Sequence, residues 1–361
     1  YNSYNLLSWL LESVECELAI KELSKLQKKY PQFAPREHPD LLSWGKAGFI
    51  PLRSPLSAEK LIISDFSTIL STIINCDNNI FVSTERHGLF IEIQTATNQN
   101  FDWSLMLFKS LAQSDNVPLD IWLYIFQGWS NQDIPEKKWR ELLNILLVNQ
   151  HLHGLLGDQF SDLLNYKFSL QYKELPKSLR KLALKLSKSI WISASTEQPT
   201  EISNWFDLSS SRPEGKIVEF WMKCLDEEIK IQGTRKLFLQ FKTMFNQVLT
   251  KKSFTGSLGR ISLVSELGFL ASLDLDWTIK NLISLFDWSN EAQALQVWQG
   301  YLVGIPHESV LKYLNPLYEQ AFDKLELLDD SSSERFVHHI AVVCVYYKTT
   351  NPPEGGWLTN F

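Results

Sequence analysis

The spacing of apolar residues predicts α-helices along almost the whole chain. Between residues 4 and 30, leucine and valine recur at intervals of three to five residues, which places them on one face of a helix, and Pro31 ends it. Residues 80–97 contain strand-forming side chains, but Leu89, Ile93 and Ala96 keep the helical spacing, and an isolated strand would lack a partner. We therefore expect helices at 4–30, 57–75, 80–97, 103–114, 118–129, 135–150, 153–166, 176–190, 213–230, 233–250, 257–271, 274–286, 289–304, 307–327 and 334–347.

A few segments interrupt this pattern. Residues 31–55 are rich in proline, and we expect Trp44 and Phe49 to hold them against the helices. Residues 193–212 are rich in serine and threonine, and the last thirteen contain two prolines and two glycines. The pattern predicts an N-terminal helical-repeat half at 1–192, a packed loop at 193–212, a C-terminal helical-repeat half at 213–348 and an extended tail at 349–361.

Two segments of the chain resemble each other. One starts at Phe101 and the other at Leu275, and each opens with Asp-Trp followed by Ser or Thr. Each continues with a leucine-rich run, a second tryptophan (Trp122 and Trp298) and a glycine beside an aromatic residue (Gly128 and Gly300). Such self-similarity is typical of stacked helical hairpins, which bury their apolar faces only against one another. The predicted fold is all-α, an irregular α-solenoid of antiparallel helical hairpins, similar to HEAT repeats.

Composition and charge exclude some classes of function. Apolar residues make up 44% of the 361, but no run approaches the roughly 20 that a membrane span requires. The net charge is −6, which argues against general binding to nucleic acid. The stretch 167–188 is locally basic. It is either a solvated helix face or a docking patch for an acidic partner. Its candidate partner-binding residues are Lys177, Arg180, Lys181 and Lys185.

Four scattered cysteines without a CxxC pair favour a reducing cytoplasm. The chain has no signal peptide and does not begin with Met; it starts inside a predicted helix. We therefore expect it to be a piece of a longer polypeptide, whose preceding part carries any chemistry.

Catalytic, cofactor-binding and metal-binding motifs are absent from the sequence. The motifs GxxxxGK[ST], GxGxxG and GxSxG do not occur. Residues 255–260 (TGSLGR) have the residue types of a nucleotide-binding loop but the wrong spacing, and they are predicted to open a helix. His151 and His153 would point to different faces of a helix. Glu136-x-Lys138 resembles half of a nuclease motif and Asp40 could be the other half, but that chemistry needs strands to present the carboxylates, and these residues lie at a predicted helix start and in a loop. We predict no cofactor, no metal and no catalytic residue in this chain.

Residues 212–322 carry a resemblance to a known family. RPEGKIVEFWMKCL from Arg212, DWTIKNLISLFDW from Asp276 and EAQALQVWQGYL from Glu291 resemble the helical region that follows a sirtuin-like NADase domain in some bacterial anti-phage proteins. HPDLLSW at 38–44 and SPLSAEKL at 54–61 are similar to the upstream part of such proteins. At 211–215 this chain keeps only the Pro and Gly of that family's usual helix opening.

The resemblance implies a sensor or regulatory region that binds a phage protein and restrains an upstream NAD-consuming effector. Protein partners are expected, either a phage protein or the chain's own effector domain, and the parent protein could be a homo-oligomer. Two alternatives are an oligomerisation scaffold and an enzyme whose site is assembled without a recognisable motif. A concave surface with exposed apolar side chains would favour partner binding, and a pocket of convergent titratable groups would favour the enzyme.

Overall fold

The computed structural model describes residues 2–34, 54–76, 84–114, 117–194 and 198–347, and within them it contains helices and no strand. The all-α prediction is confirmed. The α-helices are α1 (Asn2–Ser13), α2 (Glu17–Lys29), α3 (Ala58–Ile63), α4 (Phe66–Asn75), α5 (Thr84–Gln99), α6 (Phe101–Ala112), α7 (Leu119–Ser130), α8 (Glu136–Val148), α9 (Gly157–Leu163), α10 (Ser169–Gln171), α11 (Lys177–Ser193), α12 (Trp205–Ser211), α13 (Pro213–Gln232), α14 (Leu239–Thr250), α15 (Phe254–Ser265), α16 (Leu267–Leu273), α17 (Leu275–Asn281), α18 (Glu291–Tyr301), α19 (Glu308–Phe322) and α20 (Asp330–Tyr346).

The chain divides into two compact units, residues 1–52 and residues 53–361. The first contains α1 and α2, which contact each other, and Tyr4 meets Phe33 edge-on at 5.8 Å between ring centroids. The prediction of one helix over 4–30 is wrong, because the chain leaves the helix at Val14–Cys16. A single helix could not bury its own apolar face, whereas two short ones partly cover each other.

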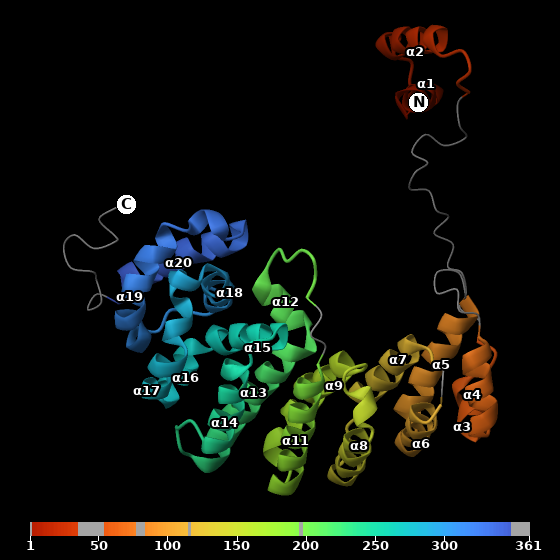
Figure 1. Ribbon diagram of the computed structural model, residues 1–361. Coiled ribbons are helices and arrows are strands. Elements are labelled where there is room, and N and C mark those ends of the chain that lie inside the picture. Colours follow the sequence, from red (N-terminus) through yellow and green to blue (C-terminus); the bar gives the residue numbers. More distant parts are fainter. Residues whose placement is uncertain (1, 35–53, 77–83, 115–116, 195–197, 348–361) are drawn as a thin grey trace. The chain divides into compact units, whose positions relative to one another are not determined.

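Helices of the second unit pack mainly against helices near to them in sequence (Figure 1). The helix α5 contacts α7, α8 contacts α11, α13 contacts α15, and α15 contacts α18. This order of neighbours is the one that stacked helical hairpins would give.

The predicted boundary at 193–212 lies inside the second unit, not between two units. Part of that segment is the helix α12, whose first turn is capped by Asn204, because the Asn204 side chain accepts a hydrogen bond from the Asp207 backbone N–H. The buried Ser209 hydroxyl donates to the Leu258 carbonyl of α15 at 2.8 Å. Within this segment Asn204 caps a helix and Ser209 makes a buried contact, so the segment is packed against the rest of the unit and is not a free linker.

Several predicted helices have different bounds in the structure. The helix expected at 153–166 is replaced by a turn at 153–156, α9 and a π-helical turn at Leu164–Phe168, and the one expected at 233–250 begins only at Leu239. Gly233 ends α13 with φ 61°, a left-handed conformation that glycine adopts at little cost. The helix at 80–97 is confirmed as α5 from Thr84 onward; residues 80–83, Trp44, Phe49 and the tail 349–361 lie outside the described residues.

The two similar segments begin in the same way. The side chain of Asn100 caps α6 by accepting from the Trp103 backbone N–H, and the side chain of Asp274 caps α17 by accepting from that of Trp277, both at 3.0 Å. Both tryptophans are buried, as is Trp298, whose burial the apolar pattern predicts.

The glycines of the two segments lie where helices cross closely. A Cβ on Gly128 would meet Thr97 of α5 at 2.5 Å, and one on Gly300 would meet the Ile261 carbonyl of α15 at 2.8 Å. Phe126 precedes Gly128 by two residues, as Trp298 precedes Gly300, whereas Trp122 lies one helical turn before Phe126. The sequence comparison therefore paired Trp298 with the wrong residue of the first segment.

No helix within the described residues is long and apolar enough to span a membrane.

Candidate functional site

The helix α11 carries the residues that the sequence marks as partner-binding. Its buried face packs against α8, α9 and α13 through side chains that include Leu179, Leu186 and Ile190. Three lysines lie on its exposed side at intervals of four residues, Lys177, Lys181 and Lys185. None of them forms an ion pair with a residue that the structure describes. We call these three residues the lysine stripe.

Arg180 does not belong to this exposed stripe. It is 9% exposed, and its guanidinium forms an ion pair with Glu228 of α13, with 3.0 Å between Nη1 and Oε1. It also lies over the ring of Tyr172, whose hydroxyl donates to the same carboxylate oxygen at 3.1 Å. Gln232 donates to the other oxygen at 2.9 Å. Arg180 therefore joins α11 to α13, and its charge is compensated inside the protein.

The stripe borders a small hollow of about 210 Å³. Arg180, Glu228 and Tyr172 contribute to its walls together with Lys177 and Lys181, and the remaining lining residues are Leu184, Gln232, Phe238 and Gln240. Since the Arg180–Glu228 pair is internally neutral, the charges left over are those of the two lysines. The hollow thus combines uncompensated positive charge with two aromatic side chains and two amides.

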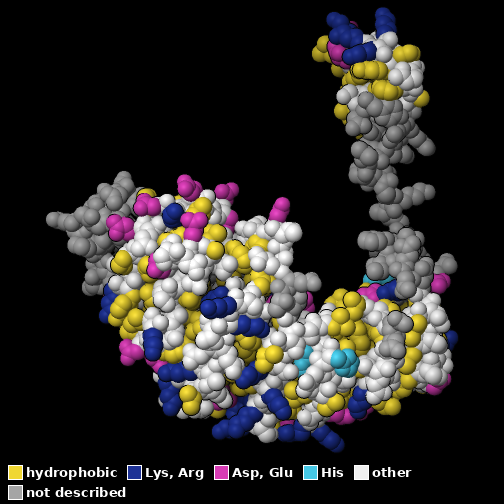
Figure 2. Space-filling view, viewed as in Figure 1, with side chains coloured by type: hydrophobic (Ala, Val, Ile, Leu, Met, Phe, Trp, Pro, Cys, Tyr) yellow, Lys and Arg dark blue, Asp and Glu magenta, His cyan; other side chains and the backbone are white. Residues whose placement is uncertain are grey.

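Other basic side chains lie nearby. Figure 2 shows lysine and arginine gathered around the lower ends of α8 and α11 in that view. Most of those on α8 are paired, Lys138 with Asp102 and Arg140 with Glu136. The unpaired lysines of α11, together with Lys137 of α8, therefore carry charge that is available to another molecule.

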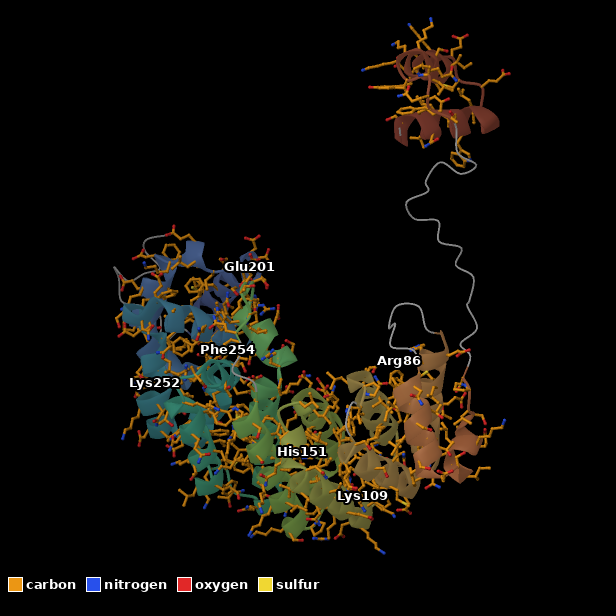
Figure 3. The ribbon with its side chains drawn as sticks, turned by 45° about the vertical axis from the view of Figure 1, so that its right-hand side comes forward. Arg86, Lys109, His151, Glu201, Lys252 and Phe254 are labelled. Carbon is orange, nitrogen blue, oxygen red and sulfur yellow. The ribbon has the colours of Figure 1, made fainter. Side chains whose placement is uncertain are left out.

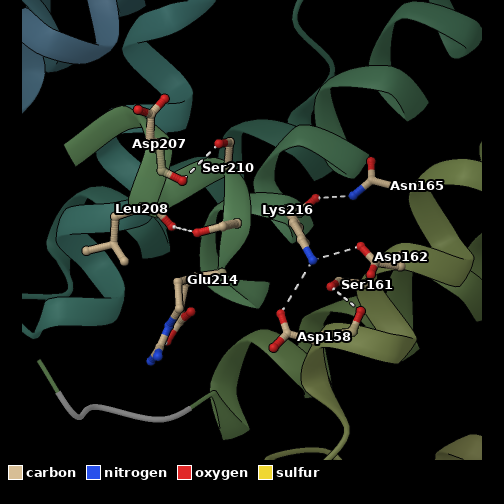
Figure 4. A network of polar contacts seen from close by, with 11 residues as sticks. Asp158, Ser161, Asp162, Asn165, Asp207, Leu208, Ser210, Glu214 and Lys216 are labelled. Atoms are coloured by element: carbon tan, nitrogen blue, oxygen red, sulfur yellow. Dashed lines mark hydrogen bonds and ion pairs between the residues drawn. The ribbon is translucent and has the colours of Figure 1, made fainter. Parts of the chain in front are cut away.

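A second set of polar contacts fixes α13, and with it Glu228, against the helices that precede α11 (Figure 4). The Lys216 ammonium lies 2.8 Å from Asp162 and 3.5 Å from Asp158. Burial alone would lower the pKa of Lys216, but the hydrogen bond and charge of Asp162 raise it above its usual value. Asn165, in the π-helical turn, donates to the Lys216 carbonyl at 2.6 Å. These contacts hold the first turn of α13 against α9 and the π-helical turn.

The weaker candidates from the sequence have structural partners. His151 (labelled in Figure 3) lies within hydrogen-bond distance of the Ala112 carbonyl. The buried His153 lies between the Ser189 hydroxyl and the Leu146 carbonyl. Burial lowers the pKa of His153, and the Leu146 carbonyl partly opposes this shift. Among the described residues no group of three His, Cys, Asp or Glu could hold a metal ion. Glu136 and Lys138 have the ion-pair partners named above, and Asp40 lies outside the described residues.

The sequence located the lysines but not the hollow beside them. Tyr172, Glu228 and Phe238 come together from three separate segments, and no spacing in the sequence relates them. The only local signal was that Arg180 is out of phase with the lysines: 177, 181 and 185 share a face, whereas 180 precedes 181 by one residue and is rotated by about 100° toward the buried face.

No family model matches the chain, and neither a curated protein nor a solved structure does.

Proposed function

We propose that this chain is a non-catalytic, protein-binding helical region that receives an acidic segment of a partner on the lysine stripe. The observation that carries the proposal is the row of exposed, unpaired lysines at 177, 181 and 185 beside the hollow. Positive charge on a rigid helix orients an acidic partner and speeds its docking. Phe238 and the amides of Gln232 and Gln240 would contact the partner's uncharged atoms.

The biological setting of the proposal comes from the resemblance over residues 212–322. In that setting the chain would be the sensor or regulatory region of a cytoplasmic bacterial antiviral protein. Its partner would be a phage protein or the chain's own upstream NAD-consuming effector domain. Binding would favour one arrangement of the effector over another, so that the partner shifts a pre-existing equilibrium.

An acidic peptide tests the surface itself. A fluorescent peptide of ten glutamates should bind the wild-type chain, and Lys181→Glu with Lys185→Glu should weaken binding roughly tenfold at low salt. The matched control is Lys109→Glu with Lys280→Glu, the same change of charge at two other exposed lysines that form no ion pair with a described residue. Equal losses in both double variants would show that only net charge matters and would contradict a site on α11.

The non-catalytic part of the proposal has its own test. The purified chain incubated with NAD, with ATP and with DNA should produce no turnover above buffer. Turnover that survives repurification and is lost on substitution of one residue would contradict it.

A scaffold is the second candidate function, and the first unit favours it. In α1 and α2 the large apolar side chains of Leu6, Trp9 and Leu18 are 58%, 48% and 75% exposed. Two short helices bury too little apolar surface to be stable alone, and a second copy of this unit would cover these side chains. Sedimentation should then show a dimer that Leu18→Glu converts to a monomer; a monomeric wild type would exclude this candidate.

A further inference from the structure

A second hollow, larger than the one beside the lysine stripe, lies among α12, α13, α15 and the start of α16. Its volume is about 570 Å³, within the range of roughly 300–1,000 Å³ that small-molecule sites occupy. Nothing in the proposed function uses it. Its lining combines apolar side chains from three helices with carboxylates from two segments.

Apolar walls come from Phe206 of α12, Met222 of α13 and Phe269 of α16. Met222 is buried, whereas both phenylalanines keep part of their surface accessible. An accessible ring in a hollow offers an apolar surface to an aliphatic chain, and its face attracts a cation.

Three carboxylates lie in the same lining. Glu219 and Asp226 are seven residues apart on one face of α13, and Glu266 lies between α15 and α16. Glu219 is paired with Lys223 and Asp226 with Lys230, each at 2.7 Å. Because Lys223 and Lys230 compensate two of the three carboxylates, one negative charge is left in the lining.

Glu266 is the carboxylate without compensation. Its side chain forms no ion pair and no hydrogen bond with a described residue, and it is exposed to solvent at the edge of the hollow. Partial burial raises the pKa of Glu266, and the charges of Glu219 and Asp226 raise it further. A positive group placed in this hollow would remove that repulsion.

The arrangement selects among positive ligands. The carboxylates are too dispersed for one metal ion, since within the part of the chain that the structure describes no three acidic, His or Cys side chains form a metal-binding group. A cation carried on an apolar stem could instead reach Glu266 while its stem covers the phenylalanine rings.

We propose that this hollow binds an organic cation, an ammonium or guanidinium group on an aliphatic stem, with Glu266 as its counter-ion and Phe206 and Phe269 as the walls for the stem. This goes beyond the proposed function, because it concerns a ligand of opposite charge at a different place. Two sources supply such chemistry, a free amine and the Lys or Arg side chain of a peptide.

Calorimetric titration at 0.15 M salt separates these sources. One probe is spermidine, and the other is the peptide Gly-Gly-Arg-Gly-Gly with both ends blocked, so that its arginine is its only charge. Binding of spermidine alone assigns the hollow to a free amine, and binding of the peptide alone assigns it to a side chain of a protein. Binding of both supports the shared chemistry, and binding of neither overturns the proposal.

Two variants of one residue test the geometry. Glu266→Gln keeps the shape and removes the charge, and it should weaken binding about tenfold or more, as loss of a charged hydrogen bond does. Glu266→Lys places an ammonium in the hollow and should abolish binding. The control Glu319→Gln removes an exposed carboxylate of α19 and should leave binding unchanged. Both Glu266 variants should have the melting temperature of the wild type. If Glu266→Gln then binds the cation as tightly as the wild type does, the proposal is overturned.

Discussion

The indole of Trp298 meets the ring of Tyr318 edge-on, with ring centroids 4.9 Å apart and planes at 72°. Phe286, Tyr301 and Phe336 surround the same indole, so that one side chain of α18 contacts aromatic residues from three other segments as well as its own helix. Trp298 is fully buried, and its ring N–H has no hydrogen-bond partner among the described residues. The Trp298 indole therefore stabilises the fold through packing alone.

Replacing Trp298 tests how far the fold depends on this cluster. Trp298→Ala should lower the free energy of unfolding by about 3–5 kcal/mol, because it leaves a large cavity among rings that cannot close around it. Trp298→Phe should lower the free energy of unfolding much less, because it keeps an aromatic ring in the cluster and no hydrogen bond is lost. Urea denaturation measures both; an alanine variant with an unchanged midpoint would mean that the indole does not support the core.

Arg180 and Lys181 are neighbours in sequence with opposite expected roles. Arg180→Ala leaves the buried Glu228 carboxylate without its ion-pair partner and should cost about 3 kcal/mol of stability or more. Lys181→Ala, at an exposed and unpaired position, should change stability by less than about 0.5 kcal/mol and should weaken binding of an acidic peptide.

Melting temperature and peptide binding, measured on both variants, separate the two roles. If Lys181→Ala were as destabilising as Arg180→Ala, the lysine would be part of the structure and not of a binding surface.

His339 makes the stability of the C-terminal helices depend on pH. It is 1% exposed, its Nε2 lies 2.9 Å from the Gly304 carbonyl and its Nδ1 lies 3.0 Å from the Tyr318 hydroxyl. Burial lowers the pKa of His339 from its usual 6.5 to about 4, because protonation would place a charge inside the core.

The sign of the effect follows from this shift. The unfolded chain binds the proton first, so the stability due to neutral His339 is fully present above pH 6.5 and is lost as pH falls toward 4. The loss should be about 3 kcal/mol. The measurement is the difference in unfolding free energy between wild type and His339→Asn at several pH values. A difference that does not shrink below pH 6.5 would contradict the prediction.

Helical periodicity was enough to predict the fold class and the burial of Trp277 and Trp298, because apolar spacing reports directly which face of a helix is covered. It failed where local capping residues decide the bounds of a helix and where a contact distant in sequence decides the role of a side chain. Asn204 starts a helix inside a serine-rich stretch that looks like a loop, and Gly233 moves the start of the next helix by several residues. The spacing that located the lysines of α11 could not show that Arg180 is already held by Glu228, 48 positions further along the sequence.

The central claim is that the lysine stripe on α11 docks a protein partner. Its most direct test is co-expression of the full-length protein with individual phage proteins, followed by pull-down and measurement of cellular NAD. At least one phage protein should be retained by the wild type and by Lys109→Glu with Lys280→Glu. Retention and the associated loss of NAD should disappear with Lys181→Glu and Lys185→Glu. If no phage protein is retained, and NAD loss persists after this region is deleted, the chain is not the sensor and the claim is wrong.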